Sequence, residues 1–307
     1  MPRISYVNGK PHLGHAYEAI ACDVLARFKR LSGINTFFLT GTDEHGEKNE
    51  RSAIKEGLSP KNFTKINSDH FQDMTRYLNI SNDFFIRTSS EKHHIASKEL
   101  WKKIKKNNQI YLDKYGGWYS IIDESFINED EIKEDSNKNK IGPSGDKLEW
   151  VEEPSYFFKL SNWTHKLLDY YDKNPNFIKP KSRRNEVISF VEQGLKDLSI
   201  SRKRLKWGIK VPDDDEHVMY VWLDALTNYI TALNYPDISN INFKSFWPAD
   251  FHIIGKDIVR FHAVYWPAFL MSAGLEPPKS IFCHGFLNID GSKMSKSLGN
   301  VLSPESL

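Results

Sequence analysis

Two histidines separated by a leucine and a glycine lie near the start of the chain, in the order His12-Leu13-Gly14-His15. The residues before this group predict a strand and those after it predict a helix, so the pair lies at a strand-to-helix turn. Such a turn is a phosphate site, because the unpaired N–H groups and positive dipole end of a helix attract anions. Gly14 lets a base or phosphate approach the backbone, and His12 and His15 can donate to phosphate oxygens. The four residues alone leave a second interpretation open, namely surface or metal-binding histidines in a loop.

A second candidate group lies near the end of the chain, in residues 291–300, which are rich in lysine, serine and glycine. Lys293 and Lys296 are three residues apart, and mobile ammonium groups can follow the charge that develops on a departing pyrophosphate. By itself this segment also fits a solvated loop. Both groups together, in this order and on a suitable fold, predict a nucleotide site.

The elements around these residues alternate between strands and helices. Strands are predicted at residues 4–7, 36–39 and 83–86, with helical patterns running to Gly33 and Gly57 between them. The rhythm returns at residues 218–233, 250–271 and 280–286. This alternation predicts an α/β fold with a Rossmann-like, doubly wound parallel sheet.

The alternation is interrupted after Asn107, where aromatic residues and a polar run from 129 to 140 predict the strands and loops of an inserted module. We therefore predict a parallel sheet split by an inserted connective domain. The expected parts are the first half of the catalytic domain (1–108), the insert (109–215), the second half (216–292), and the lysine loop with the start of a truncated following domain (293–307).

Composition excludes several classes of protein. The formal net charge of the 307 residues is only +2, so nucleic-acid contacts must come from local patches. Cys22 and Cys283 have no paired spacing, which argues against a disulfide scaffold and fits a reducing, cytoplasmic setting. The apolar stretch 263–271 is broken by Pro267 and is shorter than the ~20 residues that cross a bilayer. No membrane span is predicted.

The two groups resemble the signature motifs of class I aminoacyl-tRNA synthetases. Within that class, the chain is similar to the synthetases that charge methionine, and the likeness spans nearly the whole chain. It is carried further by five segments, residues 6–11, 41–46, 156–161, 220–225 and 255–258. Residues 200–202 and 207–209 are shared with synthetases for valine, isoleucine and leucine, which are the nearest alternative. A second alternative is a non-catalytic, tRNA-binding protein that has kept a synthetase fold.

The resemblance implies that L-methionine reacts with ATP, supplied with Mg²⁺, to give an adenylate that is passed to the acceptor end of tRNA(Met). No covalent protein nucleophile is needed, since such transfers depend on positioning and electrostatics. By the family pattern His12, Gly14 and His15 bind phosphates and Lys293 and Lys296 steady the pyrophosphate. Gly255 and Asp257 are expected to hold adenine and ribose.

The resemblance also implies a methionine site that is an aromatic cup with one charge. Its members would be Ile4, Tyr6, Asp43, Trp222, Ala225, Leu226, Tyr229, Ile258, His262 and Trp266. Asp43 would pair with the substrate ammonium group, while Tyr229 and His262 would place weak donors near the thioether sulfur. Without the resemblance, each aromatic residue would be assigned to ordinary core packing.

The chain departs from many relatives in three places. Residues 115–124 hold none of the cysteines that bind zinc in other members, so we expect no zinc, with Trp118 and Tyr119 packing in place of the metal. Arg3 stands where relatives usually have a small residue or proline. Relatives continue past the lysine loop into an anticodon-binding domain, so the chain is expected to lack that domain and its lysine loop to be mobile.

Two basic runs, residues 179–184 and 202–206, are candidates for contact with the phosphates of the acceptor stem. The simpler interpretation is that each run is a solvated face.

Overall fold

The computed structural model describes residues 1–127, 129–289, 292–293 and 301–306. The first part of the chain forms a three-stranded parallel sheet in the order β1-β2-β3. Its strands and the helices between and after them are β1 (Ser5–Tyr6), α1 (Leu13–Leu31), β2 (Leu39–Asp43), α2 (Glu47–Lys55), α3 (Pro60–Tyr77), β3 (Phe84–Arg87) and α4 (Glu91–Lys106).

The last part forms a second three-stranded parallel sheet in the order β14-β15-β9. Its elements and their neighbours are α7 (Val221–Thr231), α8 (Ile241–Phe246), β14 (His252–Gly255), a 3₁₀ turn (Lys256–Ile258), a π-helical turn (Phe261–Tyr265), α9 (Trp266–Ser272) and β15 (Ile281–His284). The described end of the chain holds the hairpin β16 (Asn288–Ile289) and β17 (Ser292–Lys293) and a 3₁₀ turn (Pro304–Ser306).

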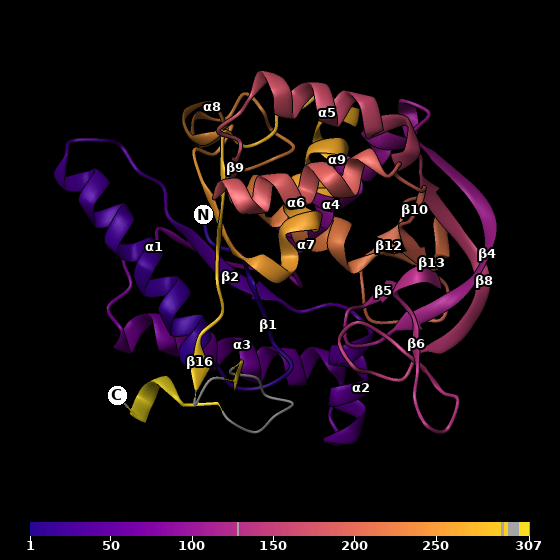
Figure 1. Cartoon of the computed structure of the whole chain (residues 1–307). Coiled ribbons are helices and arrows are strands. Elements are labelled where there is room, and N and C mark those ends of the chain that lie inside the picture. The colour runs from indigo at the N-terminus through magenta and orange to yellow at the C-terminus, as the bar shows by residue number, and fades with distance from the viewer. Residues whose placement is uncertain (128, 290–291, 294–300, 307) are drawn as a thin grey trace.

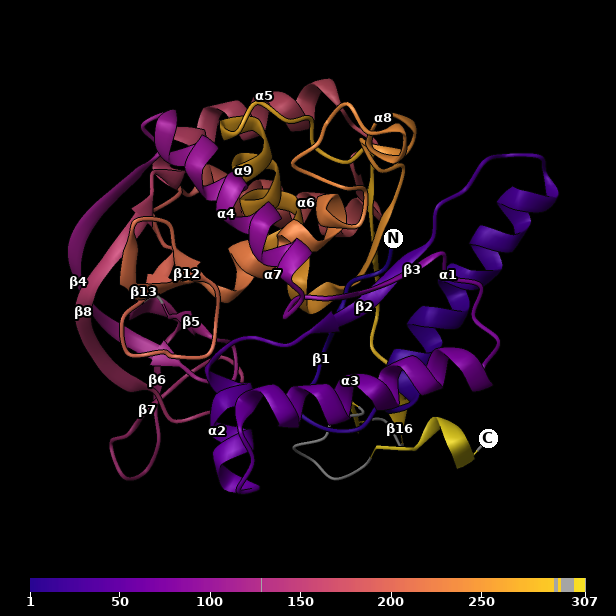
Figure 2. The ribbon, with the colours of Figure 1, turned by 180° about the vertical axis from the view of Figure 1, so that it is seen from behind.

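The two parallel sheets join edge to edge. Pro2, just before β1, bridges Ile253 of β14 in parallel, with hydrogen bonds from Arg3 N to Ile253 O (3.2 Å) and from Ile253 N to Met1 O (3.0 Å). Helices α1 and α3 lie on one side of the parallel strands and α4, α7 and α9 on the other (Figures 1 and 2). This is the predicted Rossmann-like α/β fold.

Residues between the two halves form mainly antiparallel structure, as expected for an insert. The long strands β4 (Ile110–Ser120) and β8 (Glu149–Phe158) form a curved ribbon at one end of the molecule (Figure 1). The smaller elements of this part are β5 (Ser125–Phe126), a 3₁₀ turn (Glu129–Glu131), β6 (Lys133–Glu134), β7 (Lys140–Ile141), a 3₁₀ turn (Leu160–Trp163), β10 (Leu198–Ser199), β11 (Ser201–Arg202), β12 (Lys210–Val211) and β13 (Asp214–Met219).

One strand inside the range 109–215 pairs with the catalytic sheet. Helix α5 (Thr164–Lys173) leads to β9 (Ile178–Lys179), which pairs in parallel with β15, and α6 (Lys181–Glu192) follows. One hydrophobic cluster of buried residues contains Leu39 of β2, Phe158 of β8 and Ile178 of β9. The boundaries 109 and 215 therefore stay a prediction for a part of the chain that shares its core with the parallel sheet.

The predicted elements are of the observed type, but they differ in where they begin and end and in which face is buried. The strand expected at 36–39 is β2, which starts at Leu39 and runs through the motif to Asp43. On α1 the apolar residues recur at helical spacing, yet Val24 is 63% exposed and Phe28 61% exposed. Ala16, Ala19 and Cys22 are buried instead. A cavity of about 430 Å³ lies between the last turns of α1 and the segments that lead into β2 and β14.

The two aromatic residues expected to replace a metal are not equivalent. Tyr119 is 3% exposed, meets the edge of Phe126, and has the guanidinium groups of Arg202 and Arg204 over its ring. Trp118 is only half-buried and meets Trp150, which is 55% exposed. The expectation that Trp118 is a buried aromatic is therefore wrong, because its position in β4 points it to the opposite face of the ribbon from Tyr119.

We predict that Tyr119→Ala lowers the free energy of unfolding by about 3 kcal/mol, as for other buried aromatic residues. Trp118→Ala serves as the matched control on the neighbouring position and should cost about 1 kcal/mol, since less of its surface leaves water. Urea unfolding followed by tryptophan fluorescence and circular dichroism measures both. An equal or larger loss for Trp118→Ala would contradict the assignment.

Candidate active site

The junction between β1 and β14 is where a ligand crevice is expected. All strands of the two joined sheets are parallel. From β1 the next strands, β2 and β3, are added on one side of the junction, and from β14 the next strand, β15, is added on the other side. In such sheets, ligands bind outside the carboxyl ends of the strands at this switch point. His12 and Asp257 follow β1 and β14, and Asp43 is the last residue of β2; all three are predicted site residues.

The histidine pair caps α1. His12 is the N-cap, and its Nδ1 accepts a hydrogen bond from Gly14 N (3.1 Å), while Nδ1 of His15 accepts from His12 N (3.1 Å). Two accepting Nδ1 atoms place the proton of each neutral ring on Nε2. The rings lie 3.9 Å apart, and His15 also meets the edge of Phe71.

The expectation of unpaired amides at the start of this helix is wrong for its first residues. Gly14 N is bonded to His12, and Leu13 N donates to Leu302 O (2.9 Å). The capping box satisfies Gly14 N, and the end of the chain satisfies Leu13 N, which leaves the imidazoles and the helix dipole as the anion-attracting features.

Gly255 ends β14, and Asp257 is the second residue of the 3₁₀ turn that follows. A Cβ atom on Gly255 would lie 2.5 Å from Oδ1 of Asp257, so only glycine allows this carboxylate to fold back over the strand end. Asp257 is exposed. A carboxylate at this edge is suited to bind ribose hydroxyl groups.

The lysine loop is described only in part. The backbone of Lys293 belongs to β17, which pairs with β16. Lys296 and the rest of 294–300 lie outside the described residues, and so does the prediction that this loop is mobile.

Asp43 ends β2 directly opposite Tyr6 of β1. Asp43 is only 8% exposed, and its Oδ1 atom has no hydrogen-bond partner. Burial and the nearby carboxylates of Asp224 and Glu124 raise the pKa of Asp43 well above its usual value. The carboxylate accepts a hydrogen bond from the backbone of His45, which lowers its pKa only in part. A buried carboxylate with one oxygen left without a partner is costly to the fold, so this position is suited to receive a cation.

Most of the other residues predicted for the methionine site come from α7, the π-helical turn and the start of α9. The buried ones are Ile4, Ala225, Leu226, Tyr229, Ile258, His262 and Trp266, while Tyr6 and Trp222 are half-buried. Trp222 stacks on Phe261 with ring centroids 3.7 Å apart, and it meets His262 edge-on at 6.4 Å. Tyr229 in turn lies 6.3 Å from Trp266. The structure thus brings these aromatic residues together in one cluster.

Tyr229 and His262 do not have spare donors in this arrangement. His262 Nδ1 lies 3.0 Å from the carbonyl oxygen of Ile258, which can only accept, so Nδ1 carries the proton. Nε2 of the neutral ring then accepts from the hydroxyl group of Tyr229 (2.9 Å). Burial lowers the pKa of His262 to about 4, which keeps the ring neutral. The expectation that both groups donate to a thioether sulfur therefore does not fit this state, because each proton already has an acceptor.

A buried ionic network escaped the sequence analysis. Asp224, which is 0% exposed, accepts hydrogen bonds from His45 Nδ1 (2.7 Å) and His93 Nε2 (2.7 Å). The imidazole groups lower the pKa of Asp224 against the effect of burial. This network ties α7, which carries four cup residues, to the loop after Asp43 and to α4. Its sequence signal was a histidine and an aspartate inside two segments, 41–46 and 220–225, that had already been singled out.

A second network holds the same loop from the other side. Glu44 is fully buried and receives Arg87 in a two-pronged ion pair, Nε to Oε1 (2.6 Å) and Nη2 to Oε2 (3.0 Å). Its backbone N donates to Thr88 (2.9 Å). Asp43 is therefore flanked by residues whose positions are fixed by charge-assisted hydrogen bonds.

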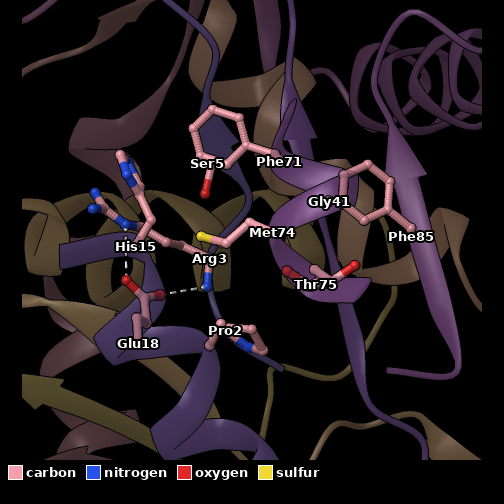
Figure 3. Close-up of a pocket in the computed structure, with 12 residues that line it drawn as sticks. Pro2, Arg3, Ser5, His15, Glu18, Gly41, Phe71, Met74, Thr75 and Phe85 are labelled. Atoms are coloured by element: carbon pink, nitrogen blue, oxygen red, sulfur yellow. Dashed lines mark hydrogen bonds and ion pairs between the residues drawn. The ribbon is translucent and has the colours of Figure 1, made fainter. Parts of the chain in front are cut away.

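Arg3 lies at the edge of the cup but is held by α1. Its backbone N and Nε donate to the two carboxylate oxygens of the buried Glu18, each at 3.1 Å. Figure 3 shows the Arg3 side chain turned toward α1, where dashed lines join it to Glu18. The charge of Arg3 is thereby neutralised, although it still helps to lower the pKa of His262.

The second basic run is not a solvated face throughout. Arg202 is 4% exposed, donates to Ser199 Oγ and Ser201 O (2.7 Å each), and lies over the rings of Tyr119 and Tyr220. Its side chain joins the ribbon to the core, so it is not available for phosphate.

No group of three His, Cys, Asp or Glu side chains within the described ranges could hold a metal ion. None of the helices described is both long enough and apolar enough to cross a membrane.

We predict that His262 makes the protein less stable as the pH falls from about 6.5 to 4, because the unfolded chain then binds a proton that folded His262 does not. The raised pKa values of Asp43 and Glu124 act in the opposite direction, so the contribution of His262 is the difference between variants. The advantage of the folded state is complete above the unfolded pKa and is lost as the pH approaches the folded one. His262→Asn keeps a donor for Ile258 and should reduce this decline by about 3 kcal/mol. Urea unfolding at pH 7, 6, 5 and 4 measures the slope. Exposed His165→Asn is the control, and equal slopes in the two variants would contradict the prediction.

Comparison with known proteins identifies the family. The family model described as "tRNA synthetases class I (M)" matches residues 2–307. The chain is 58% identical over 304 residues to "Methionine--tRNA ligase" of Rhizobium meliloti (strain 1021), covering 99% of this chain and 59% of that protein. It is 55% identical over 304 residues to the ligase of the same name from Rickettsia typhi (strain ATCC VR-144 / Wilmington), with the same two coverages.

Solved structures give the same result. The crystal structure of Mycobacterium tuberculosis methionyl-tRNA synthetase bound by methionyl-adenylate superposes with a TM-score of 0.97 at 54% identity, covering 99% of this chain and 60% of that chain. The apo form of that synthetase gives a TM-score of 0.80 at 51% identity, covering 93% and 56%. The chain thus spans about three-fifths of the length of these relatives. With its fold, its two motifs and its full-length match to the family model, the chain belongs to the class I tRNA synthetase (M) family.

Proposed function

We propose that the chain activates L-methionine with ATP to methionyl-adenylate and takes part in its transfer to the 3′ end of tRNA(Met). The observation that carries the proposal is the buried carboxylate of Asp43, which has one oxygen without a partner and lies at the carboxyl edge of the sheet, opposite Tyr6 and close enough to Asp224 of α7 for the two charges to interact. An amino acid with an ammonium group and a polarizable apolar side chain matches this carboxylate and the aromatic cluster of the candidate site. The relatives named above are ligases and synthetases for methionine.

In this proposal the methionine carboxylate attacks the α-phosphate of ATP, the bond to the β-phosphate breaks, and pyrophosphate leaves. Mg²⁺ enters as part of the ATP complex that is the substrate. His12 and His15 bind phosphate oxygens, Gly255 and Asp257 hold adenine and ribose, and Lys293 and Lys296 steady the pyrophosphate. A terminal ribose hydroxyl of tRNA then attacks the adenylate carbonyl carbon, and AMP leaves.

The site binds and orients rather than supplying a nucleophile. The Asp224 and Glu44 networks fix the loop that carries Asp43, and pre-organised groups of this kind reduce the entropic cost of reaching the transition state. The two cysteines described, Cys22 and Cys283, are free and buried, which supports a role in the reducing cytoplasm.

A site for valine, isoleucine or leucine is less well supported. The segments shared with those synthetases hold structural residues here, since Ile200 is fully buried and Trp207 Nε1 donates to Glu44 O (2.5 Å). They carry no information about the side chain of the substrate. A non-catalytic role is also less well supported, because His12 and His15 are both in place and cap the helix at the switch point.

We expect the chain to catalyse ATP–pyrophosphate exchange that depends on L-methionine and not on valine, isoleucine or leucine. The measurement is incorporation of labelled pyrophosphate into ATP with each amino acid at equal concentration. Faster exchange with valine than with methionine would overturn the choice of substrate. Absence of exchange together with absence of saturable methionine and ATP binding would favour the non-catalytic alternative.

We predict that Asp43→Asn weakens methionine binding by roughly 10-fold to 100-fold, as for the loss of a hydrogen bond to a charged group. The same change should leave the thermal midpoint unchanged or higher, because it removes a buried charge whose Oδ1 atom has no partner in the free protein and which lies near other carboxylates. Calorimetric titration and thermal unfolding measure the two effects. Asp73→Asn, at an exposed aspartate on α3, is the control for both. Loss of stability without loss of binding in Asp43→Asn would contradict the assigned role.

A further inference from the structure

Glu124 belongs to the inserted part of the chain, yet its side chain reaches the proposed amino-acid site. It follows β4 at a turn with a positive φ of 48° and is 5% exposed. The hydroxyl group of Tyr6 donates to its Oε1 (2.7 Å), and the backbone N of Lys48 donates to the same oxygen (2.8 Å). Glu124 is thus hydrogen-bonded to Tyr6 of β1 and to Lys48 of α2, each more than 70 positions away along the chain.

The backbone around this contact leaves no room for another side chain. Gly46 has φ of 102°, and a Cβ atom there would lie 2.5 Å and 2.6 Å from the two carboxylate oxygens of Glu124 and 2.6 Å from the Tyr6 hydroxyl. A glycine is therefore required for the carboxylate and the phenol to meet.

Three acidic or phenolic groups converge here. Tyr6 and Asp43 are register partners on β1 and β2, and the charge of Glu124 contributes to the raised pKa values of both. Burial raises the pKa of Glu124 itself to about 7. Two buried carboxylates, one with an unpartnered oxygen, are poorly compensated in the free protein, and an ammonium group between them would relieve the repulsion.

We propose that Glu124 is a positioning residue of the amino-acid site, which holds the Tyr6 ring over the cup and shares with Asp43 the attraction for the substrate ammonium group. This inference rests on the proposed function, because it takes the ligand to be an α-amino acid. It makes the inserted part a contributor to amino-acid recognition.

The test is calorimetric titration of the whole chain with two ligands, L-methionine and 4-(methylthio)butanoate, which is methionine without its amino group. Glu124→Gln keeps an oxygen that can accept from Tyr6 and Lys48 but removes the charge. We expect it to weaken methionine binding about tenfold, the effect of removing about 1.4 kcal/mol, and to leave binding of the amine-free ligand unchanged. Glu152→Gln, on an exposed residue of β8, is the matched control and should change neither affinity.

Tyr6→Phe separates positioning from charge and carries the test if the Gln variant does not fold. It removes only the hydroxyl group that Glu124 holds, so we expect both ligands to bind about fivefold more weakly because the ring is released. Equal methionine affinity in wild type and Glu124→Gln, or equal weakening of both ligands by Glu124→Gln, would overturn the inference. Failure of the wild type to bind methionine would instead overturn the proposed function.

Discussion

The parallel contact between the start of the chain and β14 is the constraint on which the rest of the structure depends. Three backbone hydrogen bonds, from Met1 N to Phe251 O, Arg3 N to Ile253 O and Ile253 N to Met1 O, join segments that are about 250 residues apart. They bring two three-stranded sheets into one parallel array and create the switch point at which β1 and β14 diverge. The histidine cap, Asp43 and Asp257 lie at the same carboxyl-terminal edge of the array because these strands are parallel and adjacent. The inserted ribbon does not take part in this pairing. Its residue Phe158 packs in the hydrophobic core, and the backbone hydrogen bonds of the junction involve only residues 1–3 and 251–253.

Buried carboxylates divide the site into a fixed part and a receptive part. Asp224 and Glu44 are compensated inside the protein, by two imidazoles and by a guanidinium group. Asp43 and Glu124 have no cationic side chain bonded to them among the residues that the structure describes, although both are nearly as deeply buried. Glu124 accepts hydrogen bonds from Tyr6 and Lys48, and one oxygen of Asp43 has no partner. Burial without a cationic partner lowers stability, and a bound ammonium group would offset that cost. In the proposed function, the networks of Asp224 and Glu44 hold the loop in place, and Asp43 and Glu124 attract the ligand.

Hydrogen bonds fix the tautomers of the histidines in the candidate site. His12 and His15 accept at Nδ1, whereas His262 donates at Nδ1 and accepts at Nε2, and each arrangement follows from a backbone partner that has only one hydrogen-bonding role. The aromatic cup is therefore neutral apart from Asp43 and Glu124. Such a cup favours an apolar side chain and confines charge recognition to the end of β2, which fits the division of an amino acid into a side chain and a charged α-carbon.

The sequence by itself predicted the parallel fold and the strand-to-helix position of His12 to His15, because motif spacing and strand–helix alternation are local properties. Asp43 and the aromatic residues of the cup were predicted only through the resemblance to a known family. Only the tertiary structure decided that the first amides of α1 are already bonded, that Tyr229 and His262 use their protons on internal acceptors, and that Tyr119 rather than Trp118 is buried. It also revealed the Asp224 network and the contact of Glu124 with Tyr6. These features depend on pairs of residues far apart in the chain and on which face of a strand a side chain occupies, and a single sequence does not record the distance between such groups.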